Sequence, residues 1–292
     1  MNITEVMEKA GFASEEIEKT LALDSLYPEM RDLAKGYMDR NMEAEPQEID
    51  GYFETVLKDG VTVRQLDFLF LCHAYSFLYD KYQEKGYSDE MFTDVLSDLL
   101  SKTRKCEKIY GEIGSFVFGW HWEFLRLERF QLGRIQYGFL STYRFDTPYE
   151  KGGVKVCKGD LVLDCHIPAT GPLTEELCFD SYRKAHKFFA HLFPDGITRF
   201  TCSTYLFYPP HLHFYGKNTR RFASDFDIVN VTEKDKFDDA WRIFYTFDTS
   251  DPDKLPEETT LQKNFKECLR TGSKYGSGYG IFLFDGEKII KE

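Results

Sequence analysis

The chain has 292 residues, a length that fits one large domain or, as we expect, two of ordinary size. Hydrophobic residues make up 42% of it and charged residues 29%, which are ordinary globular values and exclude wholesale disorder, collagen-like repeats and a coiled-coil rod. The formal net charge is -12, and most of it comes from residues 1–110, which carry 23 acidic and 13 basic side chains. Because this charge repels a phosphate backbone, we do not expect a nucleic acid partner.

The composition is rich in aromatic residues, since Phe, Tyr and Trp together make up 16% of the chain. They can supply both a substantial core and a ligand cleft lined with rings. The seven cysteines are odd in number and widely spaced, with no C-x-x-C pair, so we expect reduced thiols with structural roles.

The N-terminus has no basic start followed by an apolar segment, so we expect no signal peptide and a cytosolic protein. The longest apolar stretch runs from Phe68 to Tyr79 and contains His73 and Ser76. It is shorter than the roughly 20 residues that a membrane span needs, so we interpret it as a buried helix and expect no membrane association.

Up to about residue 125 the pattern is helical. Ser14 precedes two glutamates and resembles an N-cap, and the clearest helix starts near Ser88 with an apolar stripe at helical spacing. Breaks are expected at residues 41–48 and 111–119, where helix-breaking residues gather. The sequence therefore predicts a helical N-terminal domain over residues 1–125.

From residue 131 the spacing of apolar residues changes to two, which is typical of strands. The predicted elements, in chain order, are a half-buried strand over 131–145, a hairpin of 154–158 and 161–167 around Gly159-Asp160, a helix over 174–193, a strand over 197–208, a helix over 218–226, extended segments over 227–231 and 241–247, a helix around Leu261 to Leu269 that stops at Gly272, and a strand over 279–290. This alternation predicts an α/β (α+β) domain over residues 126–292, with helices flanking a mixed sheet.

The junction between residues 161–167 and the helix after Thr174 is the most informative stretch. A strand-to-helix turn leaves unpaired backbone N–H groups at the start of the helix, and with the helix dipole they suit a phosphate or pyrophosphate. Gly171 would allow a ligand to approach closely. Most such junctions only cap a helix, and Arg183 and Lys184 nearby fit a solvated helix face equally well.

The order of residues through this region resembles a family of bacterial acyltransferases that join a helical N-acyltransferase N-terminal domain to a GNAT-like C-terminal domain. The resemblance covers nearly the whole chain and is most specific over residues 131–250. It is carried by His166-Ile167-Pro168, Gly171-Pro172-Leu173, Ser181, Ala185, Phe188-Phe189, Phe193-Pro194, Cys202, Thr204 to Phe207, Pro209, Asn218 and Phe222 to Phe226.

In the GNAT superfamily, acyl-CoA lies between two splayed strands and its pyrophosphate meets the helix after the first. The resemblance therefore implies that residues 161–167 and 200–207 are the splayed pair. It implies donor-binding roles for Ile167, Pro168, Ala169, Thr170, Gly171, Pro172, Leu173 and Asn218. The superfamily's glycine-rich loop is absent from this junction, and Tyr275 to Gly280, the one similar string, precedes a strand and is interpreted as a flexible turn.

Acyl transfer of this type needs no covalent nucleophile, because the amine attacks the thioester while a base takes its proton and an acid supplies the leaving thiolate. The resemblance implies a tyrosine acid, for which Tyr208 and Tyr215 are the candidates. Asp164 and His166 share one strand face, which suits a base and its orienting carboxylate, although a structural histidine fits the same spacing.

We therefore expect an N-acyltransferase that uses acyl-CoA, for example acetyl-CoA, as co-substrate, acts on a small amine, and holds no metal or bound cofactor. The acidic helical domain would suit a cationic acceptor. One alternative is a non-catalytic ligand-binding or regulatory protein of the same fold, consistent with the missing glycines. Another is metal-dependent hydrolysis at His211-x-His213 with Cys202. Cys165 and His166 are a poor nucleophile pair because adjacent strand residues point to opposite faces. Oligomeric state is left open.

Overall fold

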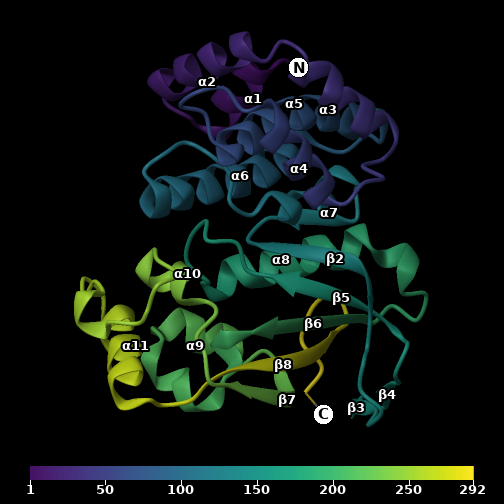
Figure 1. Cartoon of the computed structure of the whole chain (residues 1–292). Coiled ribbons are helices and arrows are strands. Elements are labelled where there is room, and N and C mark those ends of the chain that lie inside the picture. The colour runs from purple at the N-terminus through teal and green to yellow at the C-terminus, as the bar shows by residue number, and fades with distance from the viewer. Residues whose placement is uncertain (292) are drawn as a thin grey trace. The chain divides into compact units, whose positions relative to one another are not determined.

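The computed structural model describes residues 1–291 and divides into two compact units, Met1–Gln131 and a second that begins at Leu132 (Figure 1). The division falls within strand β1 (Arg129–Leu132). The expected fold class is confirmed: the first unit is helical, and the second contains a mixed sheet with helices.

The first unit consists of helices joined by short turns. They are α1 (Ile3–Ala10), α2 (Ser14–Leu26), α3 (Met30–Asp39), α4 (Pro46–Val56), α5 (Val63–Glu84), α6 (Asp89–Tyr110), the 3-10 turn η1 (Phe118–His121) and α7 (Trp122–Leu125). Helix α6 begins after Ser88, whose hydroxyl accepts from the N–H of Met91 as the sequence predicts. The predicted cap at Ser14 is wrong by one residue, because Ala13 takes that position and the Glu16 carboxylate accepts its N–H at 2.7 Å.

Helix α5 forms the centre of this unit. Its apolar stretch is buried as predicted, including Phe68, Leu69, Phe70, Leu71, Cys72, Ala74, Tyr75 and Leu78. Within residues 1–291, no helix combines the length and the apolar character that crossing a bilayer requires.

Two aspartates, the buried Asp67 and the half-buried Asp50, lie where α4 packs on α5. Asp50 and Asp67 are hydrogen bonded to each other, and Asp67 is only 5% exposed. Burial, followed by the charge of Asp50, raises the pKa of Asp67 to about 9. Two carboxylates in an apolar setting cannot both ionise, so the pair shares one proton at neutral pH.

We predict that Asp67→Asn stabilises the protein above about pH 5, because the amide donates the shared hydrogen bond without taking up a proton. In the wild type, the pKa of Asp67 is raised on folding, so its contribution to stability is present below about pH 4 and is lost as the pH rises toward 9. Urea unfolding at pH 5, 7 and 9 should show the variant gaining on the wild type by about 1 to 3 kcal/mol. A constant difference across this range would contradict the shared proton.

The second unit is built on a sheet with strand order β1-β2-β5-β6-β8-β7. Its strands are β2 (Ile135–Thr142), β5 (Leu161–His166), β6 (Thr198–Thr204), β7 (Asp227–Lys234) and β8 (Tyr275–Phe284). β5 and β6 run parallel, whereas β2 pairs antiparallel with β5 and β8 pairs antiparallel with both β6 and β7. The helices are α8 (Glu175–Phe188), α9 (Lys217–Ala223), α10 (Ala240–Phe244) and α11 (Thr260–Thr271).

Two predicted strand assignments need correction. Residues 131–145 are two strands instead of one, because Gly133, with φ 75°, and Arg134 turn the chain between β1 and β2. The predicted hairpin around Gly159-Asp160 is wrong, since β4 (Val154–Val156) pairs with β3 (Tyr149–Lys151) around Gly152-Gly153. Both of these glycines have positive φ, which a tight hairpin turn requires. β5 pairs with β2 instead.

Three boundaries also differ from the prediction. β6 ends at Thr204, where the chain enters the 3-10 turn η3 (Tyr205–Phe207). Residues 241–247 were expected to be extended, but they contain most of α10, whose apolar side chains pack against α11. The last strand spans Tyr275–Phe284 instead of 279–290. The glycine-rich string from Tyr275 to Gly280 is therefore part of this strand, and its prediction as a flexible turn is wrong.

The glycines of β8 make room for aromatic side chains from η3 and the residues that follow it. A Cβ atom on Gly276 would lie 2.5 Å from Tyr208, and one on Gly278 would lie 2.7 Å from the Cβ of Phe207. A Cβ on Gly280 would lie 2.7 Å from Phe226. The alternating glycines therefore form one flat face of β8 on which aromatic residues pack.

We predict that Gly278→Ala destabilises the protein by about 1 to 3 kcal/mol, because the new methyl group would also lie 2.8 Å from the backbone oxygen of Phe207. Gly36→Ala is the matched control, since its Cβ would meet nothing within 4 Å and alanine favours the helix α3. Thermal unfolding should show a lower melting temperature for the first variant and an unchanged or higher one for the second. Equal melting temperatures would contradict the packing argument.

Candidate active site

The two central strands pair over only part of their length. β5 has six residues and β6 has seven, but the parallel register joins only Leu163 with Phe200 and Asp164 with Thr201. β5 remains paired with β2 as far as His166, so the end of β5 separates from β6 and not from β2. We call this separation of β5 from β6 the parting. Two adjacent strands that separate in this way can receive an extended ligand between them.

Asp164 and His166 lie on the same face of β5. Val162, two residues earlier, packs in a cluster on one face of the sheet with Tyr279, and side chains two apart share a face. Both Asp164 and His166 are partly exposed. Burial raises the pKa of Tyr279, the hydrogen bond with Thr201 lowers it, and the charge of Asp164 raises it again. Asp164 therefore lies near Tyr279, whose hydroxyl group is hydrogen bonded with Thr201.

The segment between β5 and α8 has an exposed middle and buried ends. Ala169, Thr170, Gly171 and Pro172 are exposed, whereas Pro168 and Leu173 are buried. Gly171 has φ 150°, a value that favours glycine, although a Cβ there would meet no atom within 4 Å. Backbone conformation, and not lack of space, thus selects glycine at this position.

Arg134 holds this segment through all three of its guanidinium nitrogens. Nε donates to the carbonyl of Pro172 at 3.0 Å, Nη1 to that of Pro168 at 3.0 Å and Nη2 to that of Gly171 at 2.6 Å. Arg134 is only 9% exposed, and burial lowers its pKa from the ordinary value. A guanidinium remains charged in proteins, so the segment lies against a buried positive charge.

Ser181 fixes the turn that carries Arg134 onto helix α8. Its hydroxyl donates to the carbonyl of Leu132 at 2.6 Å and accepts from the N–H of Ile135 at 3.1 Å. It also lies 2.9 Å from the hydroxyl of Tyr137. One buried side chain thus joins the helix to both ends of the β1–β2 turn.

The first turn of α8 is acidic, and a basic side chain of α9 pairs with it. Thr174 caps the helix by accepting from the N–H of Leu177, and Glu175 and Glu176 follow it. Glu175 is paired at 2.8 Å with Arg221 of α9, which also holds Asp225. The pair with Arg221 offsets the charge of Glu175, which would otherwise oppose an anion at this helix end.

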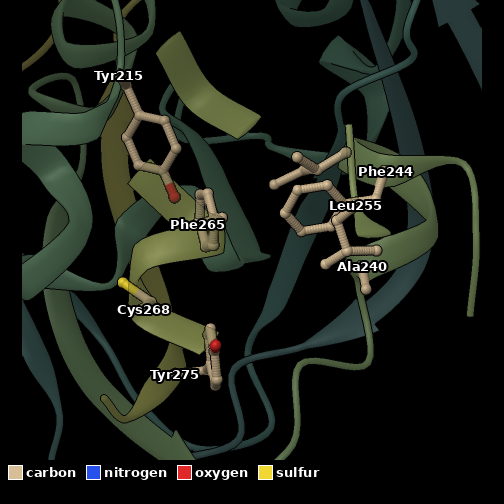
Figure 2. Packing of buried hydrophobic residues seen from close by; sticks show 8 residues of the cluster. Tyr215, Ala240, Phe244, Leu255, Phe265, Cys268 and Tyr275 are labelled. Atoms are coloured by element: carbon tan, nitrogen blue, oxygen red, sulfur yellow. The ribbon is translucent and has the colours of Figure 1, made fainter. Parts of the chain in front are cut away.

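The two candidate tyrosine acids are buried and hydrogen bonded elsewhere. The hydroxyl of Tyr208 donates to Glu233 Oε1 at 2.8 Å, and that of Tyr215 donates to the carbonyl of Tyr205 at 3.2 Å. Figure 2 shows Tyr215 beside Phe265 in an apolar cluster. Burial raises the pKa of both tyrosines.

The remaining candidates are dispersed. Asn218 is exposed near the start of α9. His211 is buried and lies 3.9 Å from the thiol of Cys268, whereas His213 is exposed. Cys202 lies two residues after Phe200, on the sheet face that packs against Tyr182 of α8. Over residues 1–291, no three His, Cys, Asp or Glu side chains gather as a metal site would require.

Comparison with known families identifies both parts of the chain. Residues 129–282 match the GNAT-like C-terminal domain, and residues 1–127 match the N-acyltransferase N-terminal domain. The chain belongs to the GNAT-like C-terminal domain family. This confirms the resemblance inferred from the residues. No curated protein matches the sequence.

Solved structures show the same fold over almost the whole chain. Three similar structures are an acyltransferase with decanoyl-CoA and teicoplanin, an acyltransferase with CoA and 10C-teicoplanin, and an acyltransferase mutant with octanoyl-CoA. Each has a TM-score of 0.72 and 17% identity, and each match covers 95% of this chain and 86% of the other. At this identity the likeness establishes the fold of the GNAT-like protein.

Sequence reasoning did not single out Arg134, which donates three hydrogen bonds to the segment before α8. The sequence predicts one strand over residues 131–145, and the contacts of Arg134 depend on the turn at Gly133 that this prediction missed. The available signal was Gly133-Arg134 between two apolar runs, a pattern typical of a tight turn.

We predict that Ser181→Ala lowers the free energy of unfolding by about 1 to 3 kcal/mol, because it leaves the groups of Leu132, Ile135 and Tyr137 without this buried partner. Urea unfolding measures the change. Ser224→Ala is the control, since its hydroxyl is exposed and bonds only within its own turn. Similar stabilities for the two variants would contradict the anchoring role of Ser181.

Proposed function

We propose that this protein is an acyltransferase that moves an acyl group from acyl-CoA to an amine. The observation that supports this best is the early end of the β5–β6 pairing, beside a segment held at the start of α8. Membership of the GNAT-like family and of the N-acyltransferase N-terminal domain family agrees with it. The acyl-CoA bound by the structurally similar acyltransferases suggests the donor class.

In this proposal the pantetheine arm lies between the ends of β5 and β6 and runs along both strands. The pyrophosphate lies at the exposed residues between Ala169 and Pro172, next to the start of the 14-residue helix α8. Asn218 is a candidate for a further polar contact with the donor. The thioester carbonyl then lies near the end of β5.

The reaction is direct attack of the amine nitrogen on the thioester carbon. A C–N bond forms, the C–S bond breaks, the amine proton passes to a base, and the CoA thiolate takes up a proton after it leaves. We propose His166 as the base and Asp164 as the carboxylate that orients it, because both lie on one face of β5 at the parting. Tyr208 and Tyr215 remain candidate acids, but their hydroxyl groups would first have to leave Glu233 and the carbonyl of Tyr205.

The acceptor in this proposal is an amine, and a cationic one suits the excess of acidic residues in the helical half. Comparing donors that carry acyl groups of different length identifies the acyl length that the protein prefers. Because the similar structures contain octanoyl-CoA and decanoyl-CoA, these donors belong in the first test beside acetyl-CoA. Teicoplanin belongs in the first set of acceptors for the same reason.

Calorimetric titration with CoA, acetyl-CoA, octanoyl-CoA and decanoyl-CoA tests the proposal. We expect saturable binding with a preference for one acyl length, followed by release of free CoA thiol when a suitable amine is added. Binding without turnover on any amine would favour the alternative, a non-catalytic protein that kept the fold and lost the reaction. No binding at millimolar concentration would contradict the proposal.

We predict that His166→Gln lowers kcat by about 10²–10⁴-fold and leaves the dissociation constant of CoA within about twofold, because the base acts on the acceptor amine and not on the donor. Asp164→Asn should lower kcat less. Stopped-flow or thiol-release assays give kcat, and calorimetry gives the binding constant. His213→Gln, an exposed histidine in the same unit, is the control. Full turnover by His166→Gln would exclude this role.

A further inference from the structure

The guanidinium of Arg134 is buried without a counter-charge. Its hydrogen-bond partners are the three carbonyl oxygens of Pro168, Gly171 and Pro172, and within residues 1–291 it has no carboxylate partner. A buried cation normally lies beside an anion, because removing an uncompensated charge from water is unfavourable. Its placement therefore calls for a negative charge that the described chain does not supply.

The same three hydrogen bonds orient the segment that Arg134 holds. In a trans peptide the C=O group and the following N–H group point in opposite directions. Because the carbonyl groups of Pro168 and Pro172 point toward the guanidinium, the N–H groups that follow them point away from it. The three hydrogen bonds therefore fix the orientation of the peptide groups in the segment before α8.

Ser181 and Arg134 together form a continuous support. Ser181 fixes the β1–β2 turn on α8, and Arg134 extends from that turn to the segment that precedes α8. The segment is exposed at its centre and lies at the N-terminus of a 14-residue helix, where the dipole adds positive potential. Fixed shape and positive potential therefore coincide at one place.

We propose that Arg134 is the positioning residue for the pyrophosphate of the donor. It holds residues 168–172 in the shape that binds the phosphates, and its charge stabilises them from behind without touching them. This inference rests on the proposed function, because acyl-CoA is the source of the pyrophosphate. One buried arginine would thus shape the phosphate-binding segment, a role that the absent glycine-rich loop would otherwise have.

The test compares two donors that carry the same acyl group, acyl-CoA and S-acyl-pantetheine, of which only the first carries phosphates. For Arg134→Gln we expect the dissociation constant of acyl-CoA to rise at least about tenfold, or about 1.4 kcal/mol, while that of S-acyl-pantetheine stays within about twofold. Arg134→Lys keeps the charge but cannot reach three carbonyls. Its dissociation constant for acyl-CoA should therefore lie between those of the wild type and Arg134→Gln. Arg270→Gln, which removes an exposed charge that is paired with Asp253, is the control.

Two further measurements guard against a folding defect. Amide hydrogen exchange of residues 167–173 should be faster in Arg134→Gln than in the wild type, with exchange elsewhere in the second unit unchanged. If that variant does not fold, Ser181→Ala gives the second route, and it should weaken acyl-CoA binding in the same donor-selective manner.

The outcomes separate the two proposals. Equal weakening of both donors, or no weakening of acyl-CoA, would overturn the role of Arg134 and leave the acyltransferase proposal standing. A wild-type protein that binds neither donor would overturn both. Selective loss of acyl-CoA affinity in the arginine variants, with the Arg270→Gln control unchanged, is the expected result.

Discussion

The parallel pairing of β5 with β6 stops after Asp164 and Thr201, and the proposed chemistry depends on this early stop. A fully paired sheet would satisfy every backbone group along both strands and leave no edge for a ligand. Here β5 stays bound to β2, and β6 stays bound to β8 along its length, so the outer neighbours hold the two strands while their shared edge opens. The opening is a property of the whole sheet and not of a loop.

The packing of β8 keeps β6 in place. Its alternating glycines give a face on which Phe207, Tyr208 and Phe226 pack. They pack so closely that a Cβ atom at any of these glycines would clash with them. These aromatic residues belong to the chain that follows β6, so their packing fixes how the chain leaves the open edge. The opposite face carries Tyr279, Ile281 and Leu283 in a second apolar cluster. Side chains are thus closely packed on both faces of β8, which gives the sheet a well-packed centre next to the place where β5 and β6 separate.

Arg134 and Ser181 supply a different kind of order, because they act through directional hydrogen bonds in a buried setting. Apolar packing would tolerate small shifts of the segment before α8, whereas three donors of one planar group fix three carbonyls in space. The helical unit has a polar pair too, the half-buried Asp50 and the buried Asp67, but there a shared proton removes one of the two negative charges. In the second unit a buried charge is kept and hydrogen bonded to carbonyl groups, whereas in the first unit a shared proton reduces the buried charge.

Residue order alone was enough to assign the helical first half, the mixed sheet of the second half, and the family. Apolar spacing gave α5, α6 and α8, and Gly272 ended α11 as expected, because these features are local and depend on a few neighbouring residues. The strand ends were less certain, since the turns at Gly133 and Gly152-Gly153 compete with other plausible turns nearby. The glycine string of β8 was misread because its reason lies in aromatic residues some 70 positions earlier.

The candidate site divides along the same line. Asp164, His166 and the segment around Gly171 were proposed from sequence, because strand alternation and a strand-to-helix junction are local patterns. The pairing of Tyr208 with Glu233 and the three carbonyl contacts of Arg134 join residues far apart in the chain. Only the tertiary structure decides such contacts, because hydrogen-bond partners are chosen by where the folded backbone places them. The sequence determined which elements form, and the fold determined which buried charge supports which loop.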